Sequence, residues 1–240
     1  MKKYLSIIIP AYNEAKRLPT TLVDVDRYLK GADFSAEVIV VDSSSSDGTQ
    51  ETVLRFSRTM KNLKLLRIEN RGKGYAVRRG MLEAEGEWRL FMDADNATAA
   101  GQFEKMRPYL KGGYDVIIGS RDIPGARLVP PQPWYRRVLG NIGNLIIQVL
   151  LLPGIWDTQC GFKCFSGRAA EKIFKLSRIE KWGFDVEILA LAKKLGYKIK
   201  EIPVTWVNDP NSKVKASAYF TTLAEVFKIR RWLWTNEYGL

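Results

Sequence analysis

The sequence predicts an α/β protein with a mostly parallel β-sheet flanked by helices. The chain has 240 residues, of which 46% are hydrophobic and 27% charged, the balance of a folded domain with a sizeable core. Short apolar runs alternate with segments of helical pattern through the first half of the chain. Within these runs the residues are apolar in succession, which is typical of parallel strands covered by helices on both faces.

The expected elements follow one another in a regular order. Strands are expected at 4–10, 37–42, 63–68, 88–93 and 115–119, with helices at 15–30, 47–60 and 72–84. The second half contains an apolar helical stretch to about residue 152, two further helices and a strand at 198–206. We expect one domain over 1–215, followed over 216–240 by an amphipathic, basic and aromatic segment that faces a membrane.

Composition excludes several kinds of site. The chain has no histidine, so Ser-His-Asp catalysis and histidine metal sites are ruled out. Its two cysteines are too few for a disulfide framework, which favours a reducing compartment and a cytoplasmic protein. We expect no signal peptide and no membrane span, because no run reaches roughly 18 apolar residues. Lys and Arg number 38 against 26 Asp and Glu, and the net charge of +12 favours acidic partners.

Polar residues follow four of the expected strands. They lie at 10–14, 42–47, 93–95 and 119–121. Open α/β sheets bind ligands beyond the carboxyl ends of their strands, so these segments are expected to form one site.

Two aspartates at a strand end suggest a metal. Asp93 and Asp95 are separated by Ala94, and both carboxylates can turn toward one hard cation such as Mg²⁺ or Mn²⁺. Such an ion would bridge diphosphate oxygens and neutralise a leaving group. An isolated Asp-x-Asp is more often a helix cap, so its position after a buried strand carries the interpretation.

Neighbouring segments suit a nucleotide. Tyr12 can stack on a base, and Glu14 and Asp42 can accept hydrogen bonds from base or ribose, while Asp47 is expected to cap the next helix. Residues 71–74 (RGKG) place Lys73 at a helix start, where backbone N–H groups favour phosphate. Their spacing is not that of a Walker loop, which argues against a kinase or ATPase.

These motifs together resemble the family 2 glycosyltransferases of GT-A fold, which have a Rossmann-like nucleotide-binding sheet. The matching segments are PAYNE (10–14), VDSSSSDGT (41–49), RGKG (71–74), DAD (93–95), GSR (119–121) and DTQCGFK (157–163). DADNAT, DTQCGFKCF, IEKWGFDVEIL and TWVNDPNSK are most similar to dolichyl-phosphate β-glucosyltransferases and other polyprenyl-phosphate glycosyltransferases. The resemblance implies a nucleoside-diphosphate sugar donor, with UDP-glucose expected, and a polyprenyl-phosphate acceptor.

The resemblance also implies roles for individual residues. The metal ligands would be Asp93 and Asp95. The catalytic residues would include Asp95, Arg121 and Arg136, the two arginines contacting donor or acceptor phosphates. The donor would be bound by Pro10, Tyr12, Glu14, Asp42, Lys73, Asp93, Ala94 and Lys213.

Three positions depart from the pattern of the related enzymes. Ser43 stands where a second aspartate is usual, which removes one polar contact. Ala97 and Val207 stand where mannosyltransferases carry Gln and Arg, which favours the glucosyl branch.

The absence of histidine bears on the acceptor. A lipid phosphate is already an anion and can attack the sugar C1 without a base, whereas a sugar hydroxyl needs one, for which Asp157 is the candidate. Two unit charges about 4 Å apart repel by roughly 4 kcal/mol at an effective dielectric near 20. A divalent cation with Arg121, Arg136 and Lys213 could offset that repulsion. We therefore expect in-line displacement with inversion, catalysed by positioning and charge neutralisation.

Two segments suggest an anionic membrane surface as a further partner. Residues 144–152 (NLIIQVLLL) are unusually apolar for a surface helix, and the tail mixes aromatic residues with Lys and Arg. The alternative for each is a helix packed on its own domain. We expect a peripheral protein at the cytoplasmic face of a membrane, with a membrane-anchored partner or a homo-oligomer as further possibilities.

Other functions stay open at this point. One is a soluble family 2 enzyme acting on a saccharide hydroxyl, and another is a polyprenyl-phosphate mannosyltransferase using GDP-mannose. An inactive scaffold is a third, prompted by Ser43. A nucleic-acid-binding module would explain the charge, but no motif supports it and acidic strand ends repel phosphate, so no nucleic acid is expected.

Overall fold

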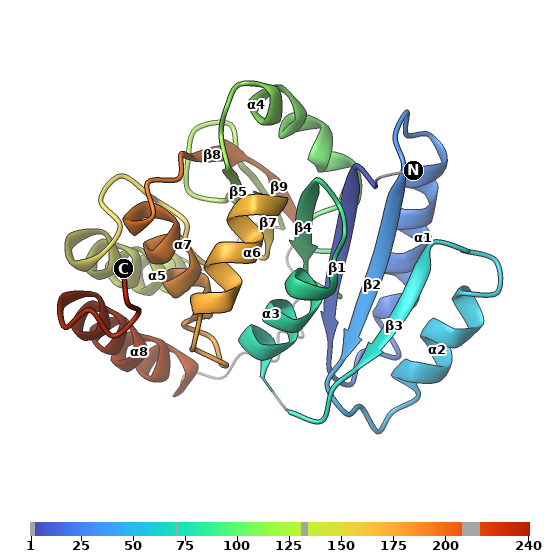
Figure 1. Ribbon diagram of the computed structural model, residues 1–240, viewed down its shortest axis with the longest axis horizontal. Helices are drawn as coiled ribbons and strands as arrows, with labels where there is room; N and C mark the ends of the chain where they lie inside the picture. Colours follow the sequence, from blue (N-terminus) through green and yellow to red (C-terminus); the bar gives the residue numbers. More distant parts are fainter. Residues whose placement is uncertain (1–2, 71, 131–133, 208–216) are drawn as a thin grey trace.

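The computed structural model describes residues 3–70, 72–130, 134–207 and 217–240, and for residues 134–139, 141–142 and 217–220 it describes the backbone alone. Its centre is a seven-stranded sheet in the order β3-β2-β1-β4-β7-β5-β8 (Figure 1). The strands of this sheet are β1 (Leu5–Ala11), β2 (Ala36–Asp42), β3 (Leu63–Arg67), β4 (Trp88–Met92), β5 (Val116–Ser120), β7 (Phe162–Ser166) and β8 (Ile199–Pro203). A second sheet pairs β6 (Arg127–Val129) with β9 (Thr205–Val207).

The main sheet is mostly parallel, as predicted. Strands β1, β2, β3 and β4 pair in parallel, and so do β5 and β8. Strand β7 runs antiparallel between β4 and β5, so the carboxyl ends of β4 and β5 still lie at the same edge. This antiparallel strand comes from the segment that follows Asp157 and was not expected as a strand.

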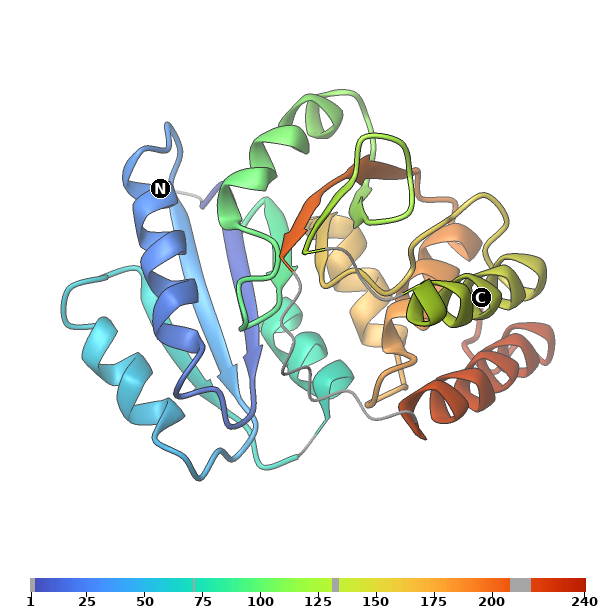
Figure 2. The same cartoon turned by 180° about the vertical axis from the view of Figure 1, so that it is seen from behind.

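Helices cover both faces of the sheet. They are α1 (Leu18–Lys30), α2 (Thr49–Phe56), α3 (Lys73–Glu83), η1 (Ala100–Lys105), α4 (Arg107–Lys111), α5 (Trp134–Leu150), α6 (Gly167–Leu176), α7 (Phe184–Lys194) and α8 (Ser217–Trp234). Figure 1 shows α3 and α6 in front of the strands, and Figure 2 shows α1 on the opposite face. The expected helices of the first half are found, with ends shifted by a few residues.

The buried side chains of β1 show how the two faces are filled. Ile8 belongs to a core that includes residues of α3, α6, α7 and α8, whereas Ile7 and Ile9 belong to a core shared with α1 and η1. All three are fully buried. Alternate residues of one strand therefore serve two cores, which explains the continuous apolar run in the sequence.

Helices α5 and α8 lie side by side at the end of the molecule remote from α2 (Figures 1 and 2). Each has a buried and an exposed face. On α5, Ile147 is buried while Val149 is 76% exposed, and on α8, Ile229 is buried while Trp234 is 84% exposed. The C-terminal segment thus packs on the main body, and the division expected at 215/216 stays a prediction because 208–216 lie outside the described residues. Among the helices described, none has the length and apolar character needed to span a bilayer.

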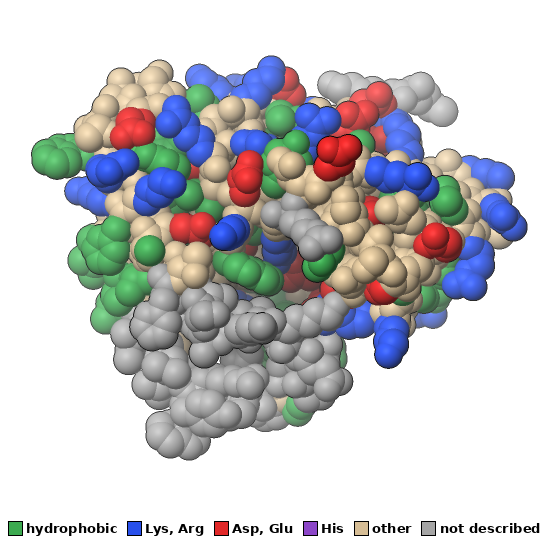
Figure 3. All heavy atoms as spheres, turned by 90° about the horizontal axis from the view of Figure 1, so that it is seen from below, with side chains coloured by type: hydrophobic (Ala, Val, Ile, Leu, Met, Phe, Trp, Pro, Cys, Tyr) green, Lys and Arg blue, Asp and Glu red, His purple; other side chains and the backbone are tan. Residues whose placement is uncertain are grey.

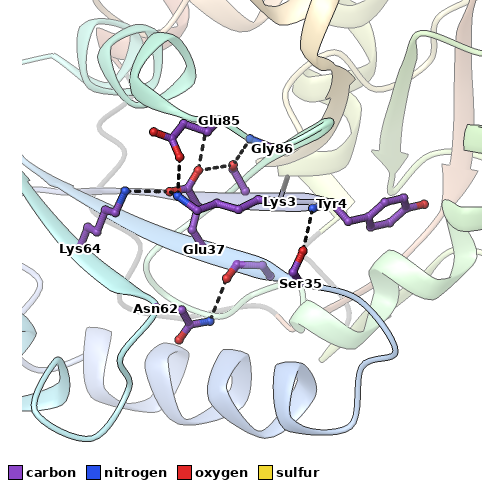
Figure 4. A network of polar contacts seen from close by, with 10 residues as sticks. Lys3, Tyr4, Ser35, Glu37, Asn62, Lys64, Glu85 and Gly86 are labelled. Atoms are coloured by element: carbon purple, nitrogen blue, oxygen red, sulfur yellow. Dashed lines mark hydrogen bonds and ion pairs between the residues drawn. The ribbon is translucent and has the colours of Figure 1, made fainter. Parts of the chain in front are cut away.

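A buried carboxylate ties the amino ends of the strands together, at the opposite edge from the polar loops (Figure 4). Glu37 at the start of β2 is 1% exposed and accepts hydrogen bonds from Lys3, Ser6 and Lys64 and from the backbone N–H of Glu85. Burial alone would raise the pKa of Glu37, but these donors outweigh it and lower the pKa from 4.5 to about 2. This network stabilises the fold far from the site described next.

Candidate active site

The polar ends of β1, β2 and β4 meet at one edge of the sheet, as predicted. Ala11 pairs with Asp42 at the ends of β1 and β2, and β4 ends one residue before Asp93. Figure 3 looks at this edge and shows a hollow in which acidic and basic side chains lie. The parallel register therefore brings Ala11, Asp42 and Asp93, which are far apart in the chain, to one edge of the sheet.

Hydrogen bonds between the loops fix this edge. The side chain of Asn13 accepts from the N–H of Ser46, and the Asn13 N–H donates to Ser45 Oγ. Asn13 has a φ of 54°, which its short polar side chain tolerates. Thr21 of α1 donates to the carbonyl of Ala94 at 2.7 Å, so the acidic loop is anchored to α1. The loops that follow β1 and β2 are therefore joined to each other, and the acidic loop that follows β4 is anchored to α1.

The two predicted metal ligands each face a cation. Lys73 Nζ lies 2.6 Å from Asp93 Oδ1, and Arg17 Nη1 lies 3.6 Å from Asp95 Oδ2. Burial and the nearby charge of Asp93 raise the pKa of Asp95. Burial lowers the pKa of Lys73, but the attraction of Asp93 and Asp185 outweighs it and the net pKa is raised. The charge of Asp93 thus disfavours the charged form of Asp95, and Arg17 and Lys73 oppose this effect.

The acidic pair fits a divalent cation shared with a ligand. No cluster of three or more metal-binding side chains occurs among the described residues. The side chains of Asp93 and Asp95 keep 30% and 23% exposure. Mg²⁺ is commonly bound by one or two carboxylates and completes its shell with water and substrate phosphates, so two accessible carboxylates suffice.

Asp93 is held by the residue that directly precedes β7, the strand that was not predicted. Its N–H donates to the carbonyl of Gly161 at 3.1 Å, just before β7. A Cβ added at Gly161 would lie 2.0 Å from Asp93 Oδ2. The side chain of Asp93 therefore fills the space that any larger residue at 161 would take.

The nucleotide-binding candidates lie beside the acidic pair. Asp42 is fully buried, and its Oδ2 accepts from Gln50 Nε2 at 2.7 Å and from the Ser45 N–H at 3.2 Å. Its Oδ1 is buried without a hydrogen-bond donor among the described residues. Tyr12 is 42% exposed and directly follows β1, in which Pro10 is the penultimate residue. A buried oxygen that lacks a donor beside an exposed aromatic ring suits the edge and face of a base.

Glu14 differs from its predicted role in one respect. Its carboxylate accepts two hydrogen bonds from Arg17, at 2.5 and 2.6 Å, and it is 8% exposed. The same arginine reaches Asp95. Glu14 therefore orients a cation toward the acidic pair in this structure, and a contact with the nucleotide stays a prediction.

Arg121 and Asp157 form a two-bond ion pair next to β5. Arg121 Nε and Nη2 donate to Asp157 at 2.7 and 2.9 Å, and the Arg121 N–H donates to it at 2.9 Å. Asp157 is fully buried; burial raises its pKa, but Arg121 outweighs this and the net pKa is lowered. A carboxylate so engaged is a weak proton acceptor, which argues against Asp157 as a base and favours it as the support of Arg121.

Two predicted residues cannot be placed in the site. The side chain of Arg136 and the whole of Lys213 lie outside the described residues. Of the departures noted in the sequence, Ser43 is 3% exposed and donates its N–H to the Ala11 carbonyl, while Ala97 donates its N–H to Asp95. Ser43 therefore follows the end of β2 and is hydrogen-bonded to the last residue of β1.

The family model described as "Glycosyl transferase family 2" matches residues 6–174. The chain belongs to glycosyl transferase family 2. It is 39% identical over 224 residues to a dolichyl-phosphate beta-glucosyltransferase of Dictyostelium discoideum, covering 88% of this chain and 68% of that protein. It is 34% identical over 226 residues to the human protein of the same name, covering 88% of this chain and 70% of that one. The chain is a glycosyltransferase, as the sequence motifs indicated.

Solved structures confirm the fold of this family 2 glycosyltransferase. Glucosyl-3-phosphoglycerate synthase of Mycobacterium tuberculosis in complex with UDP matches with a TM-score of 0.70 at 16% identity, over 95% of this chain and 80% of that one. The same protein with Mn²⁺, UDP and glucosyl-3-phosphoglycerate matches with a TM-score of 0.68 at 16% identity, over 95% of this chain and 78% of that one. At this identity the likeness concerns the fold, which is the predicted GT-A type.

Several residues of this glycosyltransferase site were not singled out from the sequence. Arg17 lies three residues after Glu14, a spacing that allows side-chain contact and could have marked it. Lys163 and Asp185 form a fully buried ion pair, and Lys163 also donates to the Cys160 carbonyl at 2.6 Å. Trp182 lies with its ring centre 5.5 Å from Lys73 Nζ. The contacts of Lys163 and Trp182 join distant segments, so no local pattern indicates them.

Proposed function

We propose that this enzyme transfers glucose from UDP-glucose to a polyprenyl phosphate of the dolichyl type, with inversion at the sugar C1. The names of its relatives, which are 34% and 39% identical, support this acceptor and this sugar. The observation that carries the proposal is the acidic pair Asp93 and Asp95, flanked by two cations and lying at the same edge of the sheet as the buried carboxylate of Asp42.

The donor would lie along the strand ends. The uracil base would reach Asp42, whose unpaired oxygen can accept an N–H, and would lie against the exposed ring of Tyr12. The diphosphate would extend toward the acidic loop and the start of α3. There Lys73 and the helix N-terminus both favour phosphate charge.

Asp93 and Asp95 would hold Mg²⁺ or Mn²⁺, which would neutralise the charge that develops on the UDP leaving group. Lys73 and Arg17 now balance these carboxylates, at 2.6 and 3.6 Å. Both cations lie at the place where the diphosphate would enter. If a divalent cation balanced the charge of Asp93 and Asp95, Lys73 and Arg17 would be able to turn toward the diphosphate oxygens.

The acceptor would bring its own nucleophile. A phosphate oxygen of the lipid attacks C1, the bond from C1 to the UDP oxygen breaks, and UDP leaves with that electron pair. No proton needs to be removed, which agrees with a chain that has no histidine and with an Asp157 that is engaged by Arg121. UDP-glucose is α-linked, so a single displacement gives the β product that the names of the relatives specify.

A lipid acceptor requires a membrane nearby, and the α5–α8 end of the molecule suits one. Large side chains are exposed there: Leu145 at 60%, Val149 at 76%, Phe227 at 54% and Trp234 at 84%. Figure 3 shows hydrophobic side chains next to basic ones at this end. Each Lys or Arg near an anionic surface contributes about 1 kcal/mol, so peripheral binding is the proposed mode.

The test is a transfer assay. Purified enzyme with labelled UDP-glucose, Mn²⁺ and dolichyl phosphate in detergent is expected to move label into the organic phase. The β configuration of the product is expected by NMR. A chelator should abolish transfer, and dolichol without its phosphate should accept no label.

Parallel reactions with GDP-mannose and with saccharide acceptors separate the alternatives. Label that appears only in a water-soluble oligosaccharide would overturn the acceptor. Transfer from GDP-mannose alone would overturn the donor. Sedimentation with anionic liposomes, reversed by high salt, tests the membrane part, and indifference to liposomes would refute it.

A further inference from the structure

The segment 178–183 between α6 and α7 packs directly on the start of α3, residues 72–75, which carries Lys73. We refer to it as the 178–183 loop. The Tyr75 N–H donates to the Glu180 carbonyl at 3.3 Å. A Cβ at Gly72 would lie 2.3 Å from that carbonyl oxygen, and one at Gly74 would lie 2.5 Å from the Ile179 carbonyl oxygen. The 178–183 loop and the start of α3 therefore touch backbone to backbone, so a shift of the loop would displace the start of α3.

This contact reaches the centre of the site through a short series of groups. Lys73 is the first residue of α3, and its Nζ lies 2.6 Å from Asp93 Oδ1 and 5.5 Å from the ring centre of Trp182. Trp182 is 37% exposed. The indole of Trp182 is exposed, so it contributes less to the core than the buried aromatic side chains do. It lies next to Lys73, the residue proposed to bind the diphosphate. It is placed to contact whatever is attached to that diphosphate.

Two carboxylates outside the site hold the ends of the 178–183 loop. Glu225 of α8 accepts from the Gly183 N–H at 2.7 Å, and a Cβ at Gly183 would lie 2.6 Å from its Oε2. Glu187 is fully buried and accepts from the N–H groups of Arg178 and Ile179 at 2.8 to 3.0 Å.

The same Glu187 also binds the end of the chain. It accepts from Tyr238 Oη at 2.7 Å, and Arg178 Nη2 donates to the Glu237 carbonyl at 2.5 Å. Helix α8 and the residues after it thus fix the loop at both ends, although they lie far from Asp93 in the chain.

We propose that α8 is a positioning element of the active site, in which Glu225 holds the 178–183 loop so that Trp182 contacts the transferred sugar beside Lys73. The sugar assignment rests on the proposed function. The positioning of the 178–183 loop and of the start of α3 by Glu225 does not depend on the identity of the substrate. A hexose presents an apolar face of C–H groups, which an indole ring can cover, while its hydroxyls remain free for polar partners.

The positioning role is tested first without substrate. Hydrogen exchange of the Tyr75 amide is compared in the wild type, Glu225→Ala and Glu225→Gln. The alanine variant is expected to exchange this amide at least about tenfold faster, because Gly183 loses a charged acceptor. The glutamine variant keeps an acceptor oxygen and is expected to stay near the wild type. Glu171→Ala, which removes a surface carboxylate from α6, is the matched control with unchanged exchange.

Measurements of substrate binding test the proposed contact between Trp182 and the sugar. Trp182→Ala is expected to weaken UDP-glucose binding about tenfold and to leave UDP binding unchanged, with Mn²⁺ present in both cases. Glu225→Ala is expected to raise the KM for UDP-glucose more than it lowers kcat. Trp182→Phe should recover part of the affinity.

The outcomes separate the two proposals. Equal exchange of the Tyr75 amide in all variants would overturn the positioning role, whatever the substrate is. Equal loss of UDP and UDP-glucose affinity in Trp182→Ala would overturn the sugar contact. A wild type that binds another nucleotide-sugar would overturn the proposed donor and leave the exchange result standing.

Discussion

Replacing Gly161 by alanine should disable the acidic pair without changing a charge. The added Cβ would lie 2.0 Å from Asp93 Oδ2, 2.3 Å from Cγ and 2.6 Å from Oδ1. Ordinary contact begins near 3.4 Å, so the Oδ2 atom must move by 3.4 − 2.0, or about 1.4 Å. A misplacement of roughly 1 Å in a catalytic arrangement can cost about 10²-fold in rate. That loss corresponds to about 2.7 kcal/mol of transition-state stabilisation.

The assay is the Mn²⁺-dependent transfer from UDP-glucose, with kcat/KM measured at several Mn²⁺ concentrations. Gly161→Ala is expected to lower kcat/KM about 10²-fold and to raise the Mn²⁺ concentration needed for half-maximal rate. The control is Gly101→Ala, whose Cβ would meet only Tyr28 Cδ2 at 3.8 Å, and it should match the wild type. Wild-type kcat/KM and Mn²⁺ dependence in a folded Gly161→Ala would refute the placement of Asp93 against Gly161.

Three further predictions address the neighbouring charges. Lys73→Met should weaken UDP binding in the presence of Mn²⁺ about tenfold, measured by calorimetry, because a charge-assisted contact is lost; unchanged affinity would exclude Lys73 from the diphosphate site. Asp157→Asn should lower the free energy of unfolding by about 3 kcal/mol in urea, because Arg121 loses its buried counter-charge; activity lost at full stability would instead restore Asp157 as a base. The pKa of Glu37 is lowered from 4.5 to about 2, so it stabilises the fold fully above pH 4.5 and loses this as the pH falls toward 2. At 1.36 kcal/mol per pH unit this lowering of the Glu37 pKa corresponds to about 3 kcal/mol. Urea titrations at pH 5 and pH 2.5 should show most of it as a loss in the wild type beyond the loss in Glu37→Gln, in which the other carboxylates titrate alike.

The sequence was sufficient for the part of the site that follows parallel strands. Asp42 and Asp93 each come directly after an apolar run, and the carboxyl ends of parallel strands meet at one edge, so their convergence could be predicted. The family motifs predicted the GT-A type of this fold. The roles of the individual site residues are predictions from these motifs and from the geometry of the strand ends.

The remaining contacts depend on tertiary packing that no short pattern encodes. Strand β7 is a five-residue segment with the charged Lys163 at its second position, and it forms a strand by pairing with β4 and β5. The contact between Gly161 and Asp93 joins the residue before β7 to the residue after β4. That between Glu225 and Gly183 joins a C-terminal helix to a loop 42 positions earlier. Such pairs are set by how helices pack on the sheet, which single-sequence periodicity does not specify.

The central claim is that Asp93 and Asp95 bind the donor diphosphate through a divalent cation. Calorimetry of UDP-glucose with the wild type and Asp95→Asn, each with Mn²⁺ and with excess chelator, tests it most directly. We predict that chelator weakens wild-type binding at least about tenfold and that Asp95→Asn binds equally weakly with or without Mn²⁺. Wild-type affinity that is the same in chelator, or an Asp95→Asn variant that keeps the Mn²⁺ effect, would contradict this account.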